Sequence, residues 1–182
     1  MVDRSYLIQN SALTEQAKAA RIVSLADRLK SQFVRTFNVP ESEVVVRQAE
    51  PDIDLAFTDT QQITGALVAD TETDFVNRDL TNVQTVIAFF AVNMLSAGPS
   101  VNRLRFKTGA SPGSGVKASL YTEPLFAATE PKGWMEQAIV YAQERMLIRV
   151  EAFQTVAAPG DRLVLEALVA EKEGNIVTLL TA

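Results

Sequence analysis

The chain has 182 residues, 47% of them hydrophobic, a formal net charge of −5, no cysteine and no histidine. This composition suffices for one folded domain without disulfides, and it excludes thiolate metal sites, histidine-ligated zinc and catalysis that needs imidazole. The negative net charge argues against duplex nucleic acid as the main partner, because binding to phosphates needs a surplus of cations. We therefore expect a protein that is not an enzyme, takes no cofactor or metal, and makes no sequence-specific contact with nucleic acid.

The first forty residues predict one amphipathic helix. Ser11 or Thr14 can cap its beginning, Asn38-Val39-Pro40 ends it, and apolar residues recur on one face at positions 22, 25, 29 and 33. Five cations against two acids over residues 14–36 make it basic. We expect its apolar stripe to pack on the rest of the chain, with a basic arm on an anionic surface or a neighbouring subunit as the alternative.

This helix divides the chain into a helical arm, residues 1–40, and a β domain, residues 41–182. Because the later segments carry their own alternating apolar pattern, the arm is predicted to be unnecessary for folding of the β domain. The first residues lack a signal-peptide pattern, and the longest apolar run is about half a membrane span, which predicts a protein that is soluble when made.

The apolar period changes to two from residue 43, which predicts short strands at 44–47, 53–58 and 63–69. Asp70, Glu72 and Asp74 then alternate with threonines, as in a calcium-binding loop. Phe75 stands where such a loop needs glycine, and Thr81 stands where it needs a bidentate glutamate. We expect a solvated acidic loop that binds no calcium.

Two further strands are predicted at residues 83–95 and 101–107. The first is apolar on both faces, with Phe89 on one and Phe90 on the other, so it needs cover from the N-terminal helix or from another molecule. The second places three cations on one face: Arg103, Arg105 and Lys107. Such a row can bind an anionic ligand, but pairing with acids of an adjacent strand or subunit is the favoured interpretation.

The glycine-rich residues 109–115 predict a hairpin loop, because the strand that follows at 116–123 offers no helix N-terminus for a phosphate. Residues 124–142 predict a long, partly apolar connection that carries Trp134. We expect this connection to plug one end of the β domain. The alternative is an aromatic ligand platform formed by Trp134 with Phe126 and Tyr141.

The stretch from residue 145 to residue 180 gives the clearest pattern in the chain. Alternating strands at 145–152 and 163–169 are separated by the turn Pro159-Gly160-Asp161, and a short strand at 176–180 follows Gly174-Asn175. This pattern predicts a β meander. With about eight or nine short strands and one helix, the chain is expected to be mainly β, an antiparallel sandwich or jelly roll with an N-terminal helical arm.

The order of residues 88–92, 101–106, 121–125, 148–152 and 163–171 resembles the single jelly-roll capsid proteins of membrane-containing icosahedral viruses, of the kind found in Thermus phages and haloarchaeal viruses. The resemblance covers residues 83–182 and is one of strand rhythm and size, without a diagnostic motif. It implies a structural role without catalysis, with contacts to copies of itself, to other virion proteins and to an internal membrane. The helical arm departs from that family's pattern.

The functional hypothesis is therefore a virion structural protein, a repeated capsid subunit made in the host cytoplasm. A decoration or head-completion protein of a tailed phage, and a carbohydrate-binding sandwich using Trp134 and Tyr121, are the alternatives. No carboxylate pair can be shown to converge as glycosidase chemistry needs. The expected interface consists of six residues: Phe89, Phe90, Arg103, Arg105, Lys107 and Trp134.

Overall fold

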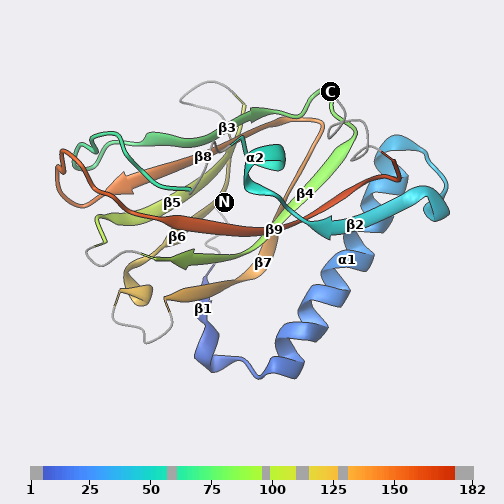
Figure 1. The fold of residues 1–182 in the computed structure, drawn as a ribbon, viewed down its shortest axis with the longest axis horizontal. Coiled ribbons are helices and arrows are strands. Elements are labelled where there is room, and N and C mark those ends of the chain that lie inside the picture. Colours follow the sequence, from blue (N-terminus) through green and yellow to red (C-terminus); the bar gives the residue numbers. More distant parts are fainter. Residues whose placement is uncertain (1–5, 57–60, 96–98, 110–114, 127–130, 175–182) are drawn as a thin grey trace.

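Two antiparallel sheets face each other in the computed structural model of this protein, which describes residues 6–56, 61–95, 99–109, 115–126 and 131–174 (Figure 1). The five-stranded sheet has the order β1 (Leu7–Gln9), β7 (Lys132–Ala142), β4 (Thr85–Met94), β9 (Leu163–Lys172) and β2 (Val44–Gln48). The four-stranded sheet has the order β3 (Thr73–Asp79), β8 (Arg145–Ala152), β5 (Val101–Thr108) and β6 (Val116–Tyr121).

The strand pairing is that of a jelly roll. Four antiparallel pairs are nested within one another along the chain: β2 with β9, β3 with β8, β4 with β7, and β5 with β6. The chain is therefore arranged as one long rolled-up hairpin, in which successive strand pairs alternate between the two sheets. The expected fold class is confirmed, including the β5–β6 hairpin, although loop residues 110–114 lie outside the described residues.

The predicted meander is wrong. The strands expected at 145–152 and 163–169 both form, the second extending to Lys172, but β8 lies in the four-stranded sheet and β9 in the other, where it pairs with β4 and β2. Residues 153–162 thus cross between the sheets instead of turning a hairpin. Alternation specifies which side chains face the core, and it does not specify which strand is the neighbour. The predicted strand at 176–180 lies outside the described residues.

Four other segments differ from expectation. Residues 51–54 form a single helical turn, α2 (Pro51–Asp54), with Pro51 in the first turn, where its missing N–H is harmless; Phe57 lies outside the described residues. Residues 63–69 make isolated bridges, such as Leu67 with Val156. The acidic stretch continues into strand β3, and the expected connection at 124–142 contains strand β7.

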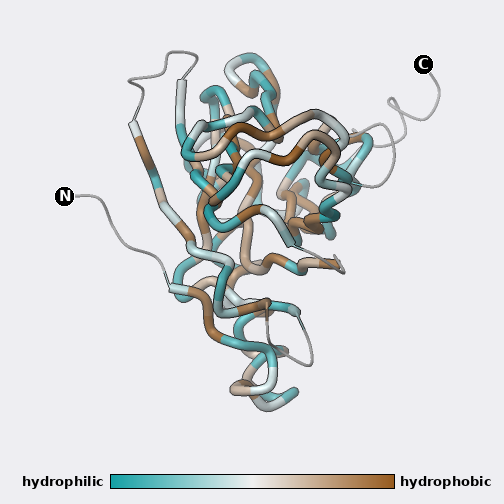
Figure 2. The backbone as a smooth tube through the Cα atoms, turned by 90° about the vertical axis from the view of Figure 1, so that its left-hand side faces the viewer, coloured by the Kyte–Doolittle hydropathy of each residue, from teal (hydrophilic) through white to brown (hydrophobic). Residues whose placement is uncertain are grey.

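The main core lies between the two sheets. Phe89 of β4 packs there against Phe106 of β5 and Tyr141 of β7, with ring centroids 5.4 Å and 6.1 Å away. The tube in Figure 2 changes repeatedly between brown and teal along the strands, which is the alternation expected when one face of a strand is buried.

Helix α1 (Glu15–Phe37) lies across the outer face of the five-stranded sheet (Figure 1). The Thr14 hydroxyl accepts a hydrogen bond from the backbone N–H of Ala17 at its start, and Asn38 ends it in the left-handed conformation with φ 53°. A second core forms beneath it, from Leu25, Leu29, Phe33, Val44, Val86, Ala88, Phe90, Ala91, Trp134, Leu168 and Ala170. The expectation that the stripe packs on the β domain is confirmed, and the helix itself covers the second apolar face of β4.

A buried ion triad closes the edge of the roll between β2 and β3. The Arg47 guanidinium donates to Asp54 at 2.6 Å and 3.0 Å, and to Glu171 of β9 at 2.6 Å. Arg78 of β3 donates to the backbone carbonyl of Ile53, so α2 is attached to both sheets. The hydrogen bond to Asp54, acting against burial, raises the pKa of Arg47 above its ordinary value. This arrangement covers an edge that would otherwise be exposed.

Candidate functional site

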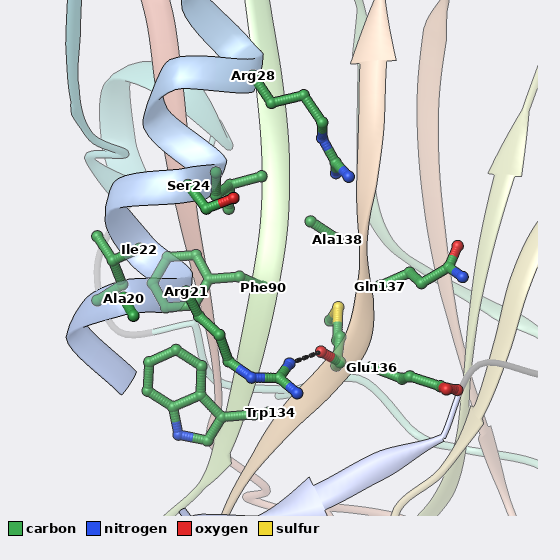
Figure 3. Close-up of a pocket in the computed structure, with 12 residues that line it drawn as sticks. Ala20, Arg21, Ile22, Ser24, Arg28, Phe90, Trp134, Glu136, Gln137 and Ala138 are labelled. Carbon is green, nitrogen blue, oxygen red and sulfur yellow. Dashed lines mark hydrogen bonds between the residues drawn. The ribbon is translucent and has the colours of Figure 1, made fainter. Parts of the chain in front are cut away.

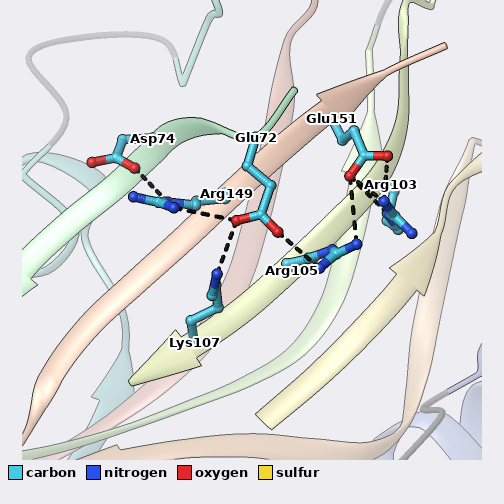
Figure 4. A network of polar contacts seen from close by, with 7 residues as sticks. All are labelled: Glu72, Asp74, Arg103, Arg105, Lys107, Arg149 and Glu151. Atoms are coloured by element: carbon cyan, nitrogen blue, oxygen red, sulfur yellow. Dashed lines mark hydrogen bonds and ion pairs between the residues drawn. The ribbon is translucent and has the colours of Figure 1, made fainter. Parts of the chain in front are cut away.

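The predicted cationic row lies on strand β5, on the face of the four-stranded sheet that points away from the main core. Arg103, Arg105 and Lys107 share that face, while Leu104 and Phe106 enter the core, as the alternation predicts. Figure 4 shows the three cations beside acidic side chains of the same chain.

The acidic partners come from β8 and from the residues around the start of β3. Arg103 donates to Glu151, whereas Arg105 and Lys107 approach the two carboxylate oxygens of Glu72 at 2.8 Å and 2.9 Å. Arg149 extends the network to Glu72 and Asp74, at 3.2 Å and 2.7 Å. Pairing with adjacent acids is therefore observed within one chain, because β8 lies between β5 and β3 and brings the acidic stretch beside the row.

The ionisation of Glu72 follows from this network. Burial alone would raise its pKa, but hydrogen bonds from Lys107 and Arg149, with the charge of Arg105, lower the pKa below its ordinary value. A carboxyl group with a lowered folded-state pKa stabilises the protein above its unfolded-state pKa, and this stabilisation is lost as the pH falls through the folded-state pKa. The ion pairs of Glu72 thus stabilise the protein at neutral pH, where its carboxyl group is ionised.

Reversing two charges of the row, in Arg103→Glu/Arg105→Glu, is expected to destabilise the isolated chain. The substitutions leave Glu151 and Glu72 facing like charges, at a cost of about 2–4 kcal/mol in the free energy of unfolding, since the two arginine side chains are 19% and 28% exposed and solvent reduces the full penalty. Urea unfolding followed by circular dichroism measures this change.

The matched control is Arg28→Glu/Arg35→Glu, because neither arginine has a carboxylate partner among the described residues. It changes the net charge equally without breaking an ion pair. An unchanged midpoint for Arg103→Glu/Arg105→Glu would contradict the intramolecular pairing and return these cations to an intermolecular role.

The three aromatic residues of the expected interface are buried inside the chain. Phe89 belongs to the core between the sheets, whereas Phe90 and Trp134 lie under helix α1 with ring centroids 5.3 Å apart. The sequence analysis expected a neighbouring molecule to cover the outer face of β4. Helix α1 already covers that face, so this reason for an interface there no longer holds. The six residues of the expected interface therefore lie in three separate places.

Trp134 is also placed differently from the predicted end plug and the predicted platform. It belongs to strand β7, and its indole Nε1–H donates to Asn10 Oδ1 at 2.8 Å. Tyr141 of the same strand points into the other core, where burial raises the pKa of its hydroxyl and its O–H donates to the Lys107 carbonyl. Phe126 packs partly buried against that same core. These rings do not form a common ligand platform.

A pocket of about 340 Å³ opens where helix α1 passes strand β7. A bulge makes room for it: Phe89 pairs with Ile139 and Ala91 with Trp134, so four residues of β7 lie opposite Phe90 alone. Leu25, Phe90 and Trp134 provide apolar walls, Met135 lines the pocket with a carbonyl that faces Arg21, and Arg21 and Arg28 stand on the helix side (Figure 3). Sequence reasoning missed this pocket because a bulge leaves no periodic signal, although the seven-residue spacing of the arginines was visible.

The acidic stretch around Asp70 shows no metal-binding arrangement in the described part of the chain. Glu72 and Asp74 make ion pairs with cations, and no group of three or more residues of metal-ligating type converges among the described residues. Asp70 stands in the left-handed region with φ 55° and begins a turn toward β3.

Within the described residues, no helix is long and apolar enough to cross a membrane. No family model, curated protein or solved structure matches this chain.

Proposed function

We propose that this protein is a virion structural protein, a repeated subunit that contacts copies of itself and other virion proteins. The observation that carries the proposal is the jelly roll of four nested antiparallel strand pairs. Jelly rolls serve as viral capsid, lectin and cupin domains, and fold alone does not choose among these. The choice therefore depends on the side chains.

The side chains favour the capsid class over the other two. Cupin chemistry relies on histidine ligands, and the sequence contains no histidine. A lectin-like platform needs aromatic rings open to solvent, but Trp134 and Tyr141 point into two different cores. Tyr121 is 53% exposed and stands beside Arg103, which offers one ring for stacking on a sugar instead of a platform. Protein contacts are the better use of this surface.

Strands β4 and β8 both end on the left in Figure 1, and three exposed apolar residues follow or neighbour these two strand ends. Val68, Leu95 and Phe153 are 54%, 48% and 47% exposed. The bridge from Ala69 to Ala152 brings Val68 and Phe153 near each other. The N–H of Leu95 donates to the carbonyl of Arg162, at the end of the connection that begins with Phe153. Exposed apolar surface of this kind marks protein contacts, so we assign the subunit interface to this end.

Sedimentation velocity over a wide concentration range, with negative-stain microscopy of the most concentrated samples, tests the proposal. We expect concentration-dependent association into regular assemblies. Leu95→Ser/Phe153→Ser should weaken this association while leaving the melting temperature nearly unchanged, because both side chains are already exposed. Val23→Ser, on the exposed face of helix α1, is the matched control and should associate normally.

Several outcomes would contradict the proposal. A chain that stays monomeric at every concentration is not a repeated subunit. If such a monomer binds a preformed phage head, the decoration alternative takes its place. If it is retained instead on a glycan array, and a Tyr121→Ala variant is not, the carbohydrate-binding alternative does.

A further inference from the structure

The arginines of helix α1 differ from most other cations of the chain. Ten lysines and arginines make ion pairs with carboxylates in the described residues. Arg21, Arg28 and Arg35 have no carboxylate partner there, and Arg21 only approaches the carbonyl of Met135, at 3.5 Å. Their spacing of seven residues places them in one row along the helix, with successive Cα atoms about 10 Å apart along the axis.

Two of these arginines flank the pocket between α1 and β7. Figure 3 shows Arg21 and Arg28 reaching from the helix toward β7, with Ala138 between them on the strand. The side chains of Glu136 and Gln137 point away from the helix, so the carboxylate of the lining strand does not neutralise the guanidinium groups. The cationic side of the pocket is therefore open to an anionic group.

The deeper walls of the same pocket are apolar. Leu25, Phe90 and Trp134 line it, and all three are buried residues of the core beneath α1. A small inorganic anion would leave these walls uncovered, and a neutral apolar molecule would leave Arg21 and Arg28 without an anionic partner. The combination of apolar walls with a few placed charged groups is typical of a small-molecule site, and the volume lies within the range of such sites.

We propose that this pocket binds a small anionic amphiphile, with its charged head between Arg21 and Arg28 and its apolar tail against Phe90 and Trp134. The occupant is a free molecule and not a bilayer, because the apolar stripe of α1 already packs on the sheet and cannot enter a membrane. This site is separate from the apolar end of the roll assigned to subunit contacts, so either proposal can fail without the other.

The chain carries its own probe for the test, since Trp134 is the single tryptophan and lines the pocket. Decanoate, kept below its micelle-forming concentration, is titrated into the full chain while Trp134 fluorescence is recorded, and calorimetry gives the stoichiometry. We expect saturable one-to-one binding and a rise in melting temperature with ligand concentration. Acetate, which lacks the tail, and decanol, which lacks the charge, should each bind far more weakly.

Variants decide whether the pocket is responsible. Arg21→Gln/Arg28→Gln should weaken decanoate binding about ten- to hundred-fold, because two charge-assisted contacts are lost. Arg35→Gln, in the same row but outside the pocket, should bind as the parent chain does. Ala138→Leu, which fills the space, should abolish binding while a cooperative melt shows that it remains folded.

The proposal is overturned if decanoate produces no saturable change, if acetate binds as well as decanoate, or if Arg35→Gln weakens binding as much as the double variant. Binding to vesicles that contain phosphatidylglycerol, without binding to free decanoate, would also overturn it in favour of a membrane-surface role for the arginine row.

Discussion

A chain lacking residues 1–38 is expected to aggregate and to show no cooperative thermal transition. Removing α1 uncovers the outer face of the five-stranded sheet, including Phe90, Trp134 and Leu168, and also removes β1 from the edge of β7. A contiguous apolar surface of that extent is rarely left exposed by a soluble monomer. This expectation replaces the one drawn from the sequence, in which the arm was unnecessary for folding.

Calorimetry and size-exclusion chromatography of the truncated chain provide the measurement. A point variant tests the packing of the helix without removing any of the chain. Phe33→Ala should lower the free energy of unfolding by about 3–5 kcal/mol, because the Phe33 side chain is fully buried between the helix and the sheet. Val23→Ala, on the exposed face of the same helix, is the control and should change it by about 0.5 kcal/mol or less. A soluble truncated chain with a sharp melt would show instead that the β domain folds alone.

Replacing Arg47 by methionine is expected to cost about 3–5 kcal/mol in the free energy of unfolding. The side chains of Asp54 and Glu171 are only 4% and 2% exposed, and both depend on this guanidinium. Methionine fills similar space but leaves two carboxylates buried without their cation. The loss should also loosen α2, since Asp54 is the residue through which Arg47 holds it.

Urea unfolding of Arg47→Met, with Arg35→Met as the control on the exposed surface of α1, measures this cost. Arg47→Lys should recover only part of the lost stability, because an ammonium group cannot reproduce the bidentate contact with Asp54 together with the contact to Glu171. If Arg47→Met left the free energy of unfolding unchanged, the ion triad would not stabilise the fold and would serve only to select this arrangement of α2.

Local pattern determined most strands of this protein and its helix. The three-and-four spacing of Leu25, Leu29 and Phe33 predicted both the helix and its buried face. Of the two candidate N-caps, Ser11 and Thr14, the structure uses Thr14, and Asn38 ends the helix as predicted. Strict alternation located β5, β8 and β9, and the doubly apolar residues 83–95 predicted the central strand β4, which is covered on both sides. These features depend on neighbours within a few residues along the chain, which is why the sequence alone reveals them.

Only the tertiary structure decided which strands are neighbours and which groups each charged or aromatic side chain contacts. The pairing of β2 with β9 joins residues 120 or more positions apart, and local alternation carries no information about such a pairing. The pairing of β8 with both β5 and β3 turned the row of Arg103, Arg105 and Lys107 from an expected subunit contact into an internal network. The pairing of β4 with β7 likewise placed Trp134 beneath helix α1, and the bulge in this pairing opened the pocket beside Arg21 and Arg28. Such a bulge has no periodic signal in the sequence.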